Sequence, residues 1–312
     1  MNKTFIKYAL LFFIPVVLGY MLIECITLSL PSPYEKNEIL LKQNSDDIQI
    51  LILGSSQMSH AINAGLLSET SINLSSGNQH HDTDFKLLKA LQPRLSGLKT
   101  VILEVSYSHF ELPYNGTDFW KNSVFLKYYD INCFERRTYF KDKLIYLSFP
   151  RFFSEMIIDH YMTKEDPAEF NTYGFDTLNY NGLFKDLDYD EAKIADVLRF
   201  KINTEENLDL FQNNAKLFFE MLDFLNEQDL NVIICNTPMY KTYLSKRNTS
   251  ILKRRDSILT VVANRYPSVQ FLNKEEDTTL FDVRDYWNQS HLNPDGASKF
   301  TKMLENELSK PH

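Results

Sequence analysis

Two segments far apart in the chain carry side chains that could act together as a nucleophile and its base. Gly54-Ser55-Ser56-Gln57 follows a short apolar run, and Ser290-His291-Leu292-Asn293-Pro294 lies near the other end of the chain. A serine hydroxyl becomes an effective nucleophile when an imidazole within hydrogen-bond reach takes its proton. Either Ser55 or Ser56 could supply the hydroxyl. The sequence therefore predicts acyl-transfer chemistry if the fold brings these two segments together.

The elements around these segments have the pattern of an α/β protein. Apolar runs typical of buried parallel strands occur at Ile48–Gly54, Leu98–Val105 and Leu230–Asn236, with weaker ones around Asn73 and at Val269–Asn273. Helical patterns alternate with them: Asp84–Leu95, Leu208–Leu225 with Thr204 as its cap, and a last helix opened by Asn293-Pro294. We expect a three-layer α/β domain, a parallel sheet with helices on both faces, with the serines at its carboxyl edge.

The stretch from Tyr107 to about Lys201 interrupts this alternation. It is rich in Tyr, Phe and Asn, and it follows the third strand at the edge where open α/β sheets bind ligands. Two interpretations stand: a lid or substrate-binding cap, or a structural excursion packed on the sheet.

The N-terminal segment predicts a membrane anchor. Tyr8 to Leu30 is almost wholly apolar and long enough to cross a bilayer, and Lys3 and Lys7 precede it. The positive-inside tendency places residues 1–30 as a cytoplasmic stub plus transmembrane helix, with the rest outside the cytoplasm. Residues 31–47 then form a polar tether, and 48–312 the α/β domain with its insertion at 107–201. The alternative is a cleavable signal peptide, although no A-x-A-like site follows.

Glu24 is unusual because it lies within this apolar segment. A carboxylate inside a span is costly, so it is expected to find a partner or to lie near an interface. The more specific hypothesis is that Glu24 contacts another membrane protein.

Composition narrows the function classes. The 312 residues carry a formal net charge of −8, which argues against a nucleic-acid partner. Three cysteines give no disulfide framework, and Cys235, in a strand-like run, is expected as a buried thiol rather than a partner of Cys133. No cluster has the spacing of metal ligands, so no metal or other cofactor is expected. His80 and His81 are expected to be solvated loop residues.

The two opening motifs together resemble a known family. GSSQ after the first strand and NQSHLNPDGA before the last helix are similar to the SGNH (GDSL-like) hydrolase superfamily. The closer resemblance, covering residues 1 to about 310, is to its membrane-anchored branch, which includes proteins of alginate O-acetylation and of D-alanyl transfer to teichoic acids. The resemblance implies a flavodoxin-like sheet.

The resemblance also assigns roles by position. Gly54-Ser55-Ser56 matches the family's Gly-Asp-Ser, which makes Ser56 the nucleophile, and His291 matches the base. Gly77 matches the glycine whose backbone N–H helps to bind the oxyanion.

Two departures from the family pattern are visible. Where the family has Asp three residues before the histidine, this chain has Asn288, so Asp285 or Asp282 is considered as a substitute carboxylate. The Gly-x-Asn-Asp block expected after the third strand is replaced by Glu104-Val105-Ser106-Tyr107, and Asn78 is considered in place of its oxyanion asparagine.

The resemblance implies an extracytoplasmic, membrane-anchored serine esterase or O-acyltransferase that acts on cell-surface polysaccharide or a small acylated substrate. It further implies a multi-span membrane acyltransferase as partner. The alternative, based on the two departures, is a catalytically impaired module that binds glycan or scaffolds a polysaccharide-modification complex.

Overall fold

The computed structural model describes residues 3–135, 139–163 and 168–310, and these residues form two compact units. One unit combines the N-terminal segment up to Ser32 with residues 117–167. The other combines residues 33–116 with residues 168–312 and contains the sheet. The expected insertion at 107–201 is therefore divided: its middle belongs with the N-terminal helix, and its ends belong with the α/β unit.

The sheet has five parallel strands in the order β2-β1-β3-β4-β5. This is the flavodoxin-like order, and its site-forming edge is at the carboxyl ends of the strands. All residues of β1 and β3 are buried, as their continuous apolar runs predict. The α/β prediction is confirmed. The strands are β1 (Ile50–Leu53), β2 (Ser71–Asn73), β3 (Thr100–Glu104), β4 (Asn231–Asn236) and β5 (Gln270–Asn273).

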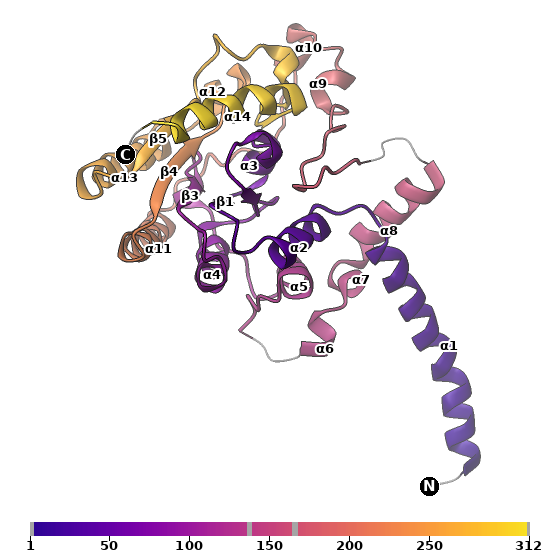
Figure 1. The fold of residues 1–312 in the computed structure, drawn as a ribbon. Helices are drawn as coiled ribbons and strands as arrows, with labels where there is room; N and C mark the ends of the chain where they lie inside the picture. Colours follow the sequence, from indigo (N-terminus) through magenta and orange to yellow (C-terminus); the bar gives the residue numbers. More distant parts are fainter. Residues whose placement is uncertain (1–2, 136–138, 164–167, 311–312) are drawn as a thin grey trace. The chain divides into compact units, whose positions relative to one another are not determined.

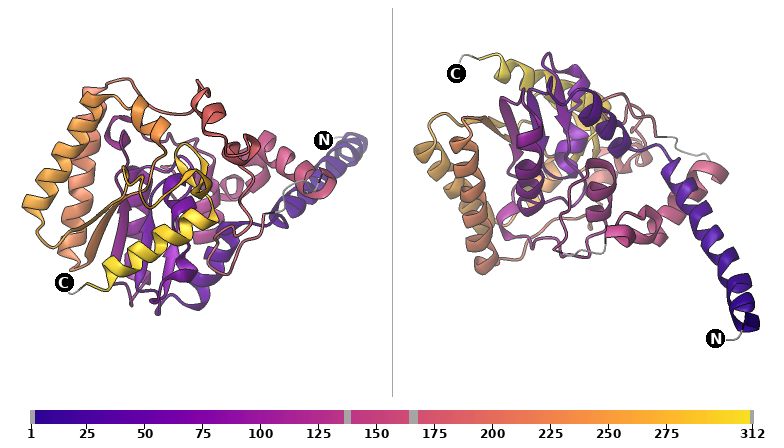
Figure 2. Two further views of the ribbon diagram at one scale, coloured as in Figure 1. Left: turned by 90° about the horizontal axis from the view of Figure 1, so that it is seen from above. Right: turned by 60° about the horizontal axis from the view of Figure 1, so that its bottom comes forward.

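Helices cover both faces of the sheet (Figure 1). On one face lie α3 (Ser56–Ala61) and α14 (Pro294–Leu308), whose Phe300 and Leu304 pack on Ile52 and Ile233. On the other face lie α4 (His81–Leu91), α11 (Leu208–Glu227) and α13 (Thr249–Arg265). The last two run side by side (Figure 2), joined by an ion pair between Arg265 and Asp223.

Helix ends follow local capping chemistry. Asn293 caps α14 by accepting from the N–H groups of Asp295 and Gly296, as predicted. The cap of α11 is Asn207, whose side chain accepts from Leu210 N, so the prediction of Thr204 is wrong. Thr and Asn are both common N-cap residues, but the helical backbone begins only after Asn207.

Residues 31–47, expected as a polar tether, are mostly helical. Helix α2 (Pro33–Gln43) occupies most of this segment, with Asn37 and Leu41 buried. The Asn37 side chain donates to the Asn73 carbonyl at 2.9 Å, which fixes α2 to the end of β2. The buried Asn37 and Leu41 help to dock a segment that is mostly polar in composition.

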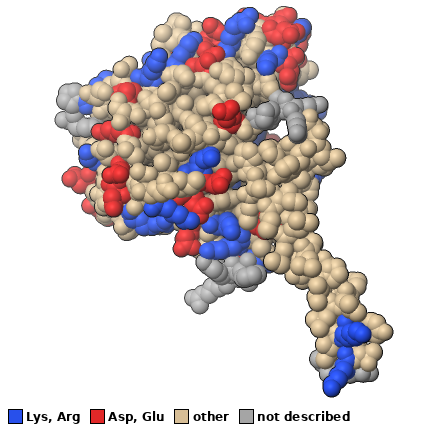
Figure 3. Space-filling view, turned by 45° about the vertical axis from the view of Figure 1, so that its right-hand side comes forward, with Lys and Arg blue, Asp and Glu red and all other residues tan. Residues whose placement is uncertain are grey.

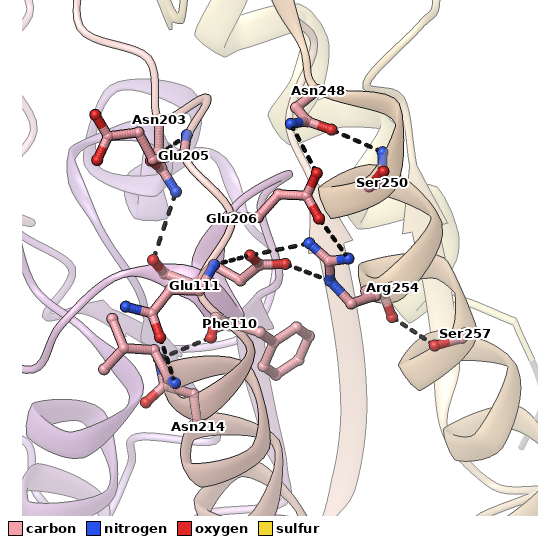
Figure 4. A network of polar contacts seen from close by, with 12 residues as sticks. Phe110, Glu111, Asn203, Glu205, Glu206, Asn214, Asn248, Ser250, Arg254 and Ser257 are labelled. Carbon is pink, nitrogen blue, oxygen red and sulfur yellow. Dashed lines mark hydrogen bonds and ion pairs between the residues drawn. The ribbon is translucent and has the colours of Figure 1, made fainter.

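An ionic network around the buried Glu111 holds the C-terminal end of the insertion (Figure 4). Arg254 of α13 pairs with both oxygens of Glu111 at 2.7 and 3.1 Å, and with Glu206 at 3.0 Å. Glu111 also accepts from Asn207 N at 2.7 Å. The loop after β3 and the start of α11 are therefore held together. The smaller elements of this unit are η1 (Ala64–Leu66), η2 (Gln92–Arg94), η3 (His109–Glu111), α9 (Leu183–Asp186), α10 (Glu191–Ala195), α12 (Lys241–Lys246), η6 (Val283–Asp285), β6 (Tyr286–Asn288) and β7 (His291–Leu292).

The other unit is built on α1 (Lys3–Leu28), the one helix among the described residues that is long and apolar enough to cross a membrane. Figure 3 shows α1 uncharged over most of its length, with basic side chains at its N-terminal end. The remaining elements of this unit are α5 (Lys121–Val124), η4 (Phe125–Tyr129), α6 (Tyr139–Asp142), α7 (Ile145–Ser148), α8 (Pro150–Ile158) and η5 (Asp159–Thr163).

Candidate functional site

The turn after β1 presents Ser56 at the carboxyl edge of the sheet. Gly54 has a φ of 147°, and a Cβ there would lie 2.8 Å from the side chains of Glu104 and Met58, so only glycine fits. Ser55 is the N-cap of α3 and accepts from Gln57 N at 3.2 Å, and Ser56 is the first residue of the helix.

Ser56, His291 and Asn288 form a continuous hydrogen-bonded chain. His291 Nε2 lies 2.8 Å from Ser56 Oγ, and His291 Nδ1 lies 2.9 Å from Asn288 Oδ1. Asn288 and His291 face each other across the two-stranded hairpin β6–β7. The hairpin therefore holds the imidazole and its amide partner in register, while the N-terminus of α14 follows directly.

The hydrogen bonds also fix the tautomer of His291. Ser290 N–H donates to Asn288 Oδ1 at 2.9 Å, which identifies that atom as the amide oxygen. An oxygen can only accept, so the ring proton lies on Nδ1 and Nε2 accepts from the Ser56 hydroxyl. This is the arrangement that a general base requires.

His291 is kept neutral by its surroundings. Burial, with smaller contributions from His60 and Lys201, lowers the pKa of His291 to about 3. His60 has its ring centroid 4.8 Å from that of His291, and burial lowers the pKa of His60 to about 4. Both rings are unprotonated at neutral pH, so His291 is available to take a proton.

His60 and Trp287 line the site without having been predicted. The rings of His60 and Trp287 lie 5.8 Å apart, and Trp287 packs against His291 at 6.3 Å. His60 follows Ser56 by four residues on α3, so helical spacing alone places both side chains on one face of the helix. That spacing was the available signal for His60. Trp287 is one residue from Asn288, and only the hairpin shows which way it points.

The buried Glu104 carboxyl group supports the turn that contains Ser55 and Ser56. Glu104, at the end of β3, accepts from Ser55 N at 2.6 Å and from Ser55 Oγ at 2.9 Å. Burial raises the pKa of Glu104 above its ordinary value, and the hydrogen bonds from Ser55 partly offset this effect. Glu104 is the first residue of the segment that stands in place of the Gly-x-Asn-Asp block expected after the third strand. It positions Ser55, the residue before Ser56.

The two predicted oxyanion residues lie on the loop after β2. β1 and β2 pair with Ile52 opposite Asn73, and the ladder continues through Ser76 N to Gly54 O at 3.0 Å. Gly77 and Asn78 form the turn that follows this ladder. Asn78 is exposed with a φ of 60°, and its side-chain oxygen accepts from Lys201.

The substitute carboxylates do not bind His291. Asp285 Oδ2 accepts from Asp282 N at 2.9 Å and pairs with Lys299 at 2.7 Å, while Asp282 Oδ1 accepts from Arg284 N. Both carboxylates are used in the capping box that opens η6. Neither takes the place of Asn288 as the partner of His291 Nδ1.

His80 and His81 are buried, so the prediction of solvated loop residues is wrong. They are 4% and 0% exposed, and His81 stacks on the buried His109 with ring centroids 3.8 Å apart. His81 Nε2 lies 2.8 Å from the Glu104 carbonyl oxygen. The loop is polar in composition, but it folds inward under the carboxyl ends of β1 and β3.

The remaining side of the site is formed by residues 168–201 of the insertion. Asn179 Nδ2 lies 3.4 Å from His60 Nδ1, and a Cβ on Gly182 would come within 2.5 Å of the Trp287 ring. Phe184 and Ile194 are fully buried in the core beneath α14. This part of the insertion therefore packs structurally on the domain and also contacts the residues that line the site.

Cys133 and Cys235 are both buried, and Cys235 is a free thiol, as expected. In the described part of the chain, no three His, Cys, Asp or Glu side chains are grouped as metal ligands.

No family model matches this chain, and no curated protein matches it. The solved structures that are similar at low identity include the following three. A Streptococcus pneumonia protein provisionally described as a platelet activating factor is 11% identical, with 88% of this chain and 91% of that chain covered and a TM-score of 0.41. A Bacteroides fragilis protein provisionally described as an acylhydrolase is 10% identical, with 91% and 94% covered and a TM-score of 0.38.

The third is an active-site mutant of a family two carbohydrate esterase from Clostridium thermocellum. It is 8% identical, with 84% of this chain and 63% of that chain covered, and the TM-score is 0.37. At TM-scores below 0.5, these likenesses are too distant to support an inference about activity.

Proposed function

We propose that this chain is a membrane-anchored serine esterase or O-acyltransferase of the SGNH type, acting outside the cytoplasm on acyl groups of cell-surface polysaccharide. The observation that carries the proposal is the 2.8 Å contact between Ser56 Oγ and the accepting Nε2 of His291. Asn288, on the other side of the ring, fixes the tautomer that makes this contact productive.

The proposed reaction proceeds through an acyl-enzyme. Ser56 Oγ attacks the acyl carbonyl carbon while its proton passes to His291 Nε2. The N–H groups of Ser56 and Gly77 stabilise the oxyanion. His291 then returns the proton to the departing alcohol or thiol. In the second half-reaction, a sugar hydroxyl or water gives its proton to His291 Nε2 and attacks the acyl carbon. His291 passes that proton to Ser56 Oγ as the bond from the serine to the acyl group breaks.

The proposed membrane anchoring is supported by hydrogen bonds between α1 and a later segment of the same chain. Glu24 of α1 accepts hydrogen bonds from Ile145 N and Tyr146 N at 2.7 and 2.8 Å. A signal peptide that is removed after export has no need of such contacts with the mature chain. We therefore favour retention of α1 with the N-terminus in the cytoplasm. A multi-span acyltransferase that supplies acyl groups remains part of the proposal, but Glu24 no longer argues for it, because its partners lie in the same chain.

Labelling with a fluorophosphonate probe tests the serine chemistry. We expect wild-type protein to be labelled and Ser56→Ala to lose the label, because no other serine has an accepting imidazole nitrogen at 2.8 Å among the described contacts. Ser55→Ala is the matched control: it keeps Ser56 and is expected to label at a reduced rate. Absence of labelling in wild type, or labelling that persists in Ser56→Ala, would refute the proposal.

The second candidate, a glycan-binding or scaffolding module without turnover, is favoured by Asn288, which cannot stabilise an imidazolium with charge. It predicts that neither the wild type nor Asn288→Asp is labelled, while the protein still binds acylated polysaccharide.

A further inference from the structure

Glu24 finds its hydrogen-bond donors in a segment more than a hundred residues later. Its two carboxylate oxygens accept from Ile145 N and Tyr146 N, at the start of α7. Glu24 is sixteen residues beyond Tyr8, which corresponds to about 24 Å along a helix that rises 1.5 Å per residue. With a hydrocarbon core of about 30 Å, Glu24 lies just inside its outer boundary when Tyr8 stands at the inner one. Ile145 and Tyr146 must share that depth.

A second contact fixes the far end of the same segment. Ser29 Oγ, immediately after α1, lies 2.9 Å from the hydroxyl of Tyr161 in η5. Both ends of residues 145–163 are therefore tied to the outer end of α1. All of these residues belong to one compact unit with α1. We call residues 145–163 the collar.

The collar exposes apolar side chains. Met162 is 77% exposed, and a further four side chains are more than a third exposed: Leu147, Phe149, Ile158 and Tyr161. Trp120 packs beside it, with its ring 5.8, 5.1 and 5.6 Å from those of Phe149, Phe152 and Phe153. Tryptophan and tyrosine are enriched where hydrocarbon meets headgroups.

We propose that the collar lies in the outer interfacial layer of the membrane and that its exposed apolar side chains contact lipid. This inference rests on the proposed anchoring by α1. Lipid is favoured over a protein partner because the apolar window of α1 is itself uncovered, and the collar's exposed side chains continue from its outer end. Amphipathic segments with aromatic and aliphatic side chains bind at this level of a bilayer.

Fluorescence quenching in nanodiscs tests the inference on the full chain. In a Cys25→Ser background, where Cys133 and Cys235 are buried, Met162→Cys is labelled with the polarity-sensitive dye NBD. Lipids with a doxyl group high on the acyl chain are expected to quench this label at least twofold relative to lipids without it. Leu198→Cys, which is 84% exposed in the other unit, is the matched control and is expected to be unquenched.

A second comparison tests the Glu24 contact. Glu24→Leu makes α1 more apolar, so insertion is kept, but it removes both acceptors. We expect quenching at position 162 to fall at least twofold, while Glu24→Gln, which keeps one acceptor oxygen, retains more of it. Unchanged quenching in Glu24→Leu would contradict the role given to Glu24.

The outcomes separate this inference from the anchoring on which it rests. Protein that does not co-purify with nanodiscs refutes the anchor. Protein that co-purifies but shows water-like emission at position 162, or equal quenching at positions 162 and 198, refutes the lipid contact of the collar alone. Apolar emission at position 162 that doxyl lipids do not quench, and that appears only when another membrane protein is added, points to a protein partner and overturns the proposal.

Discussion

The imidazole of His291 is held by an amide at the position where a carboxylate would add charge. Asn288 supplies the geometry, because its oxygen accepts from Nδ1 and is itself fixed by Ser290 N–H. It cannot stabilise the imidazolium that forms when Ser56 gives up its proton. A site of this kind is expected to react with an activated acyl group more readily than with a stable ester.

Asn288→Asp is therefore expected to label faster with a fluorophosphonate, by about 10-fold or more, which corresponds to about 1.4 kcal/mol of transition-state stabilisation.

The wild type should show no fall in labelling rate between pH 8 and pH 5, because the pKa of His291 is lowered to about 3. In the variant, the adjacent carboxylate raises this pKa, and a decline on the acid side should appear. A rate equal to that of the wild type at every pH would show that the missing charge does not limit the reaction.

At the scale of elements, the carboxyl end of β3 supports the turn between β1 and α3. Glu104 binds both the N–H and the hydroxyl of Ser55, and its side chain fills the space that a Cβ on Gly54 would need. The position of Ser56 thus depends on a residue of a neighbouring strand. Further along, the loop after β2 folds inward on a group of buried histidines.

Glu104→Ala removes both acceptors and leaves a buried N–H without its partner, which costs about 1–3 kcal/mol. We expect its labelling rate to fall at least 10-fold. Glu104→Gln should retain most of the rate, because its oxygen can accept from Ser55 N while its amide donates to the Ser55 hydroxyl. Labelling rate and thermal midpoint are measured together for both variants. Equal rates for Glu104→Ala and the wild type would rule out the supporting role.

His109→Phe tests the histidine group through its acid sensitivity. Burial, with His81 and His80 nearby, holds the pKa of His109 well below its ordinary value. The unfolded chain binds a proton near pH 6.5 that the folded protein does not, so stability is lost as the pH falls below 6.5. Between pH 7 and pH 5 the variant should lose about 2 kcal/mol less than the wild type.

Urea denaturation in detergent at the two pH values measures this difference. The buried Asp84 has its pKa raised to about 8, so its contribution has the opposite sign and is lost as the pH rises. It is present in both proteins and cancels in the comparison. An identical pH dependence for the two proteins would mean that His109 binds a proton as readily in the folded protein as in the unfolded chain.

At the scale of the whole molecule, the compact unit formed by α1 and residues 117–167 favours a retained anchor. α1 contributes the acceptor for Ile145 and Tyr146, so removing it would expose the collar that packs against it. We expect the protein in the membrane fraction to have the full 36.6 kDa mass. Intact-mass spectrometry would reveal a product shortened by about thirty residues if the segment were a cleaved signal peptide.

The sequence alone determined the features that depend on neighbouring residues. Apolar runs predicted β1, β3 and β4, because a strand buried on both faces must be apolar throughout, and weaker runs predicted β2 and β5. Asn293-Pro294 predicted the start of α14, because capping is decided within one turn of helix. The meeting of the serine turn with His291 was predicted from two motifs whose elements must meet at one edge of a parallel sheet. The choice of Ser56 over Ser55 came from the family resemblance, and the structure places Ser56 Oγ 2.8 Å from His291 Nε2.

Only the tertiary structure decided which distant groups satisfy one another. The partners of Glu24 and the support of Ser55 by Glu104 join residues far apart in the chain, and no local pattern identifies them. The burial of His80 and His81 and the docking of α2 depend on what packs against polar segments, which composition does not record. Burial and hydrogen bonding depend on contacts between elements that are distant in the sequence. The sequence therefore identified the reactive groups, but only the fold determined the environment of each.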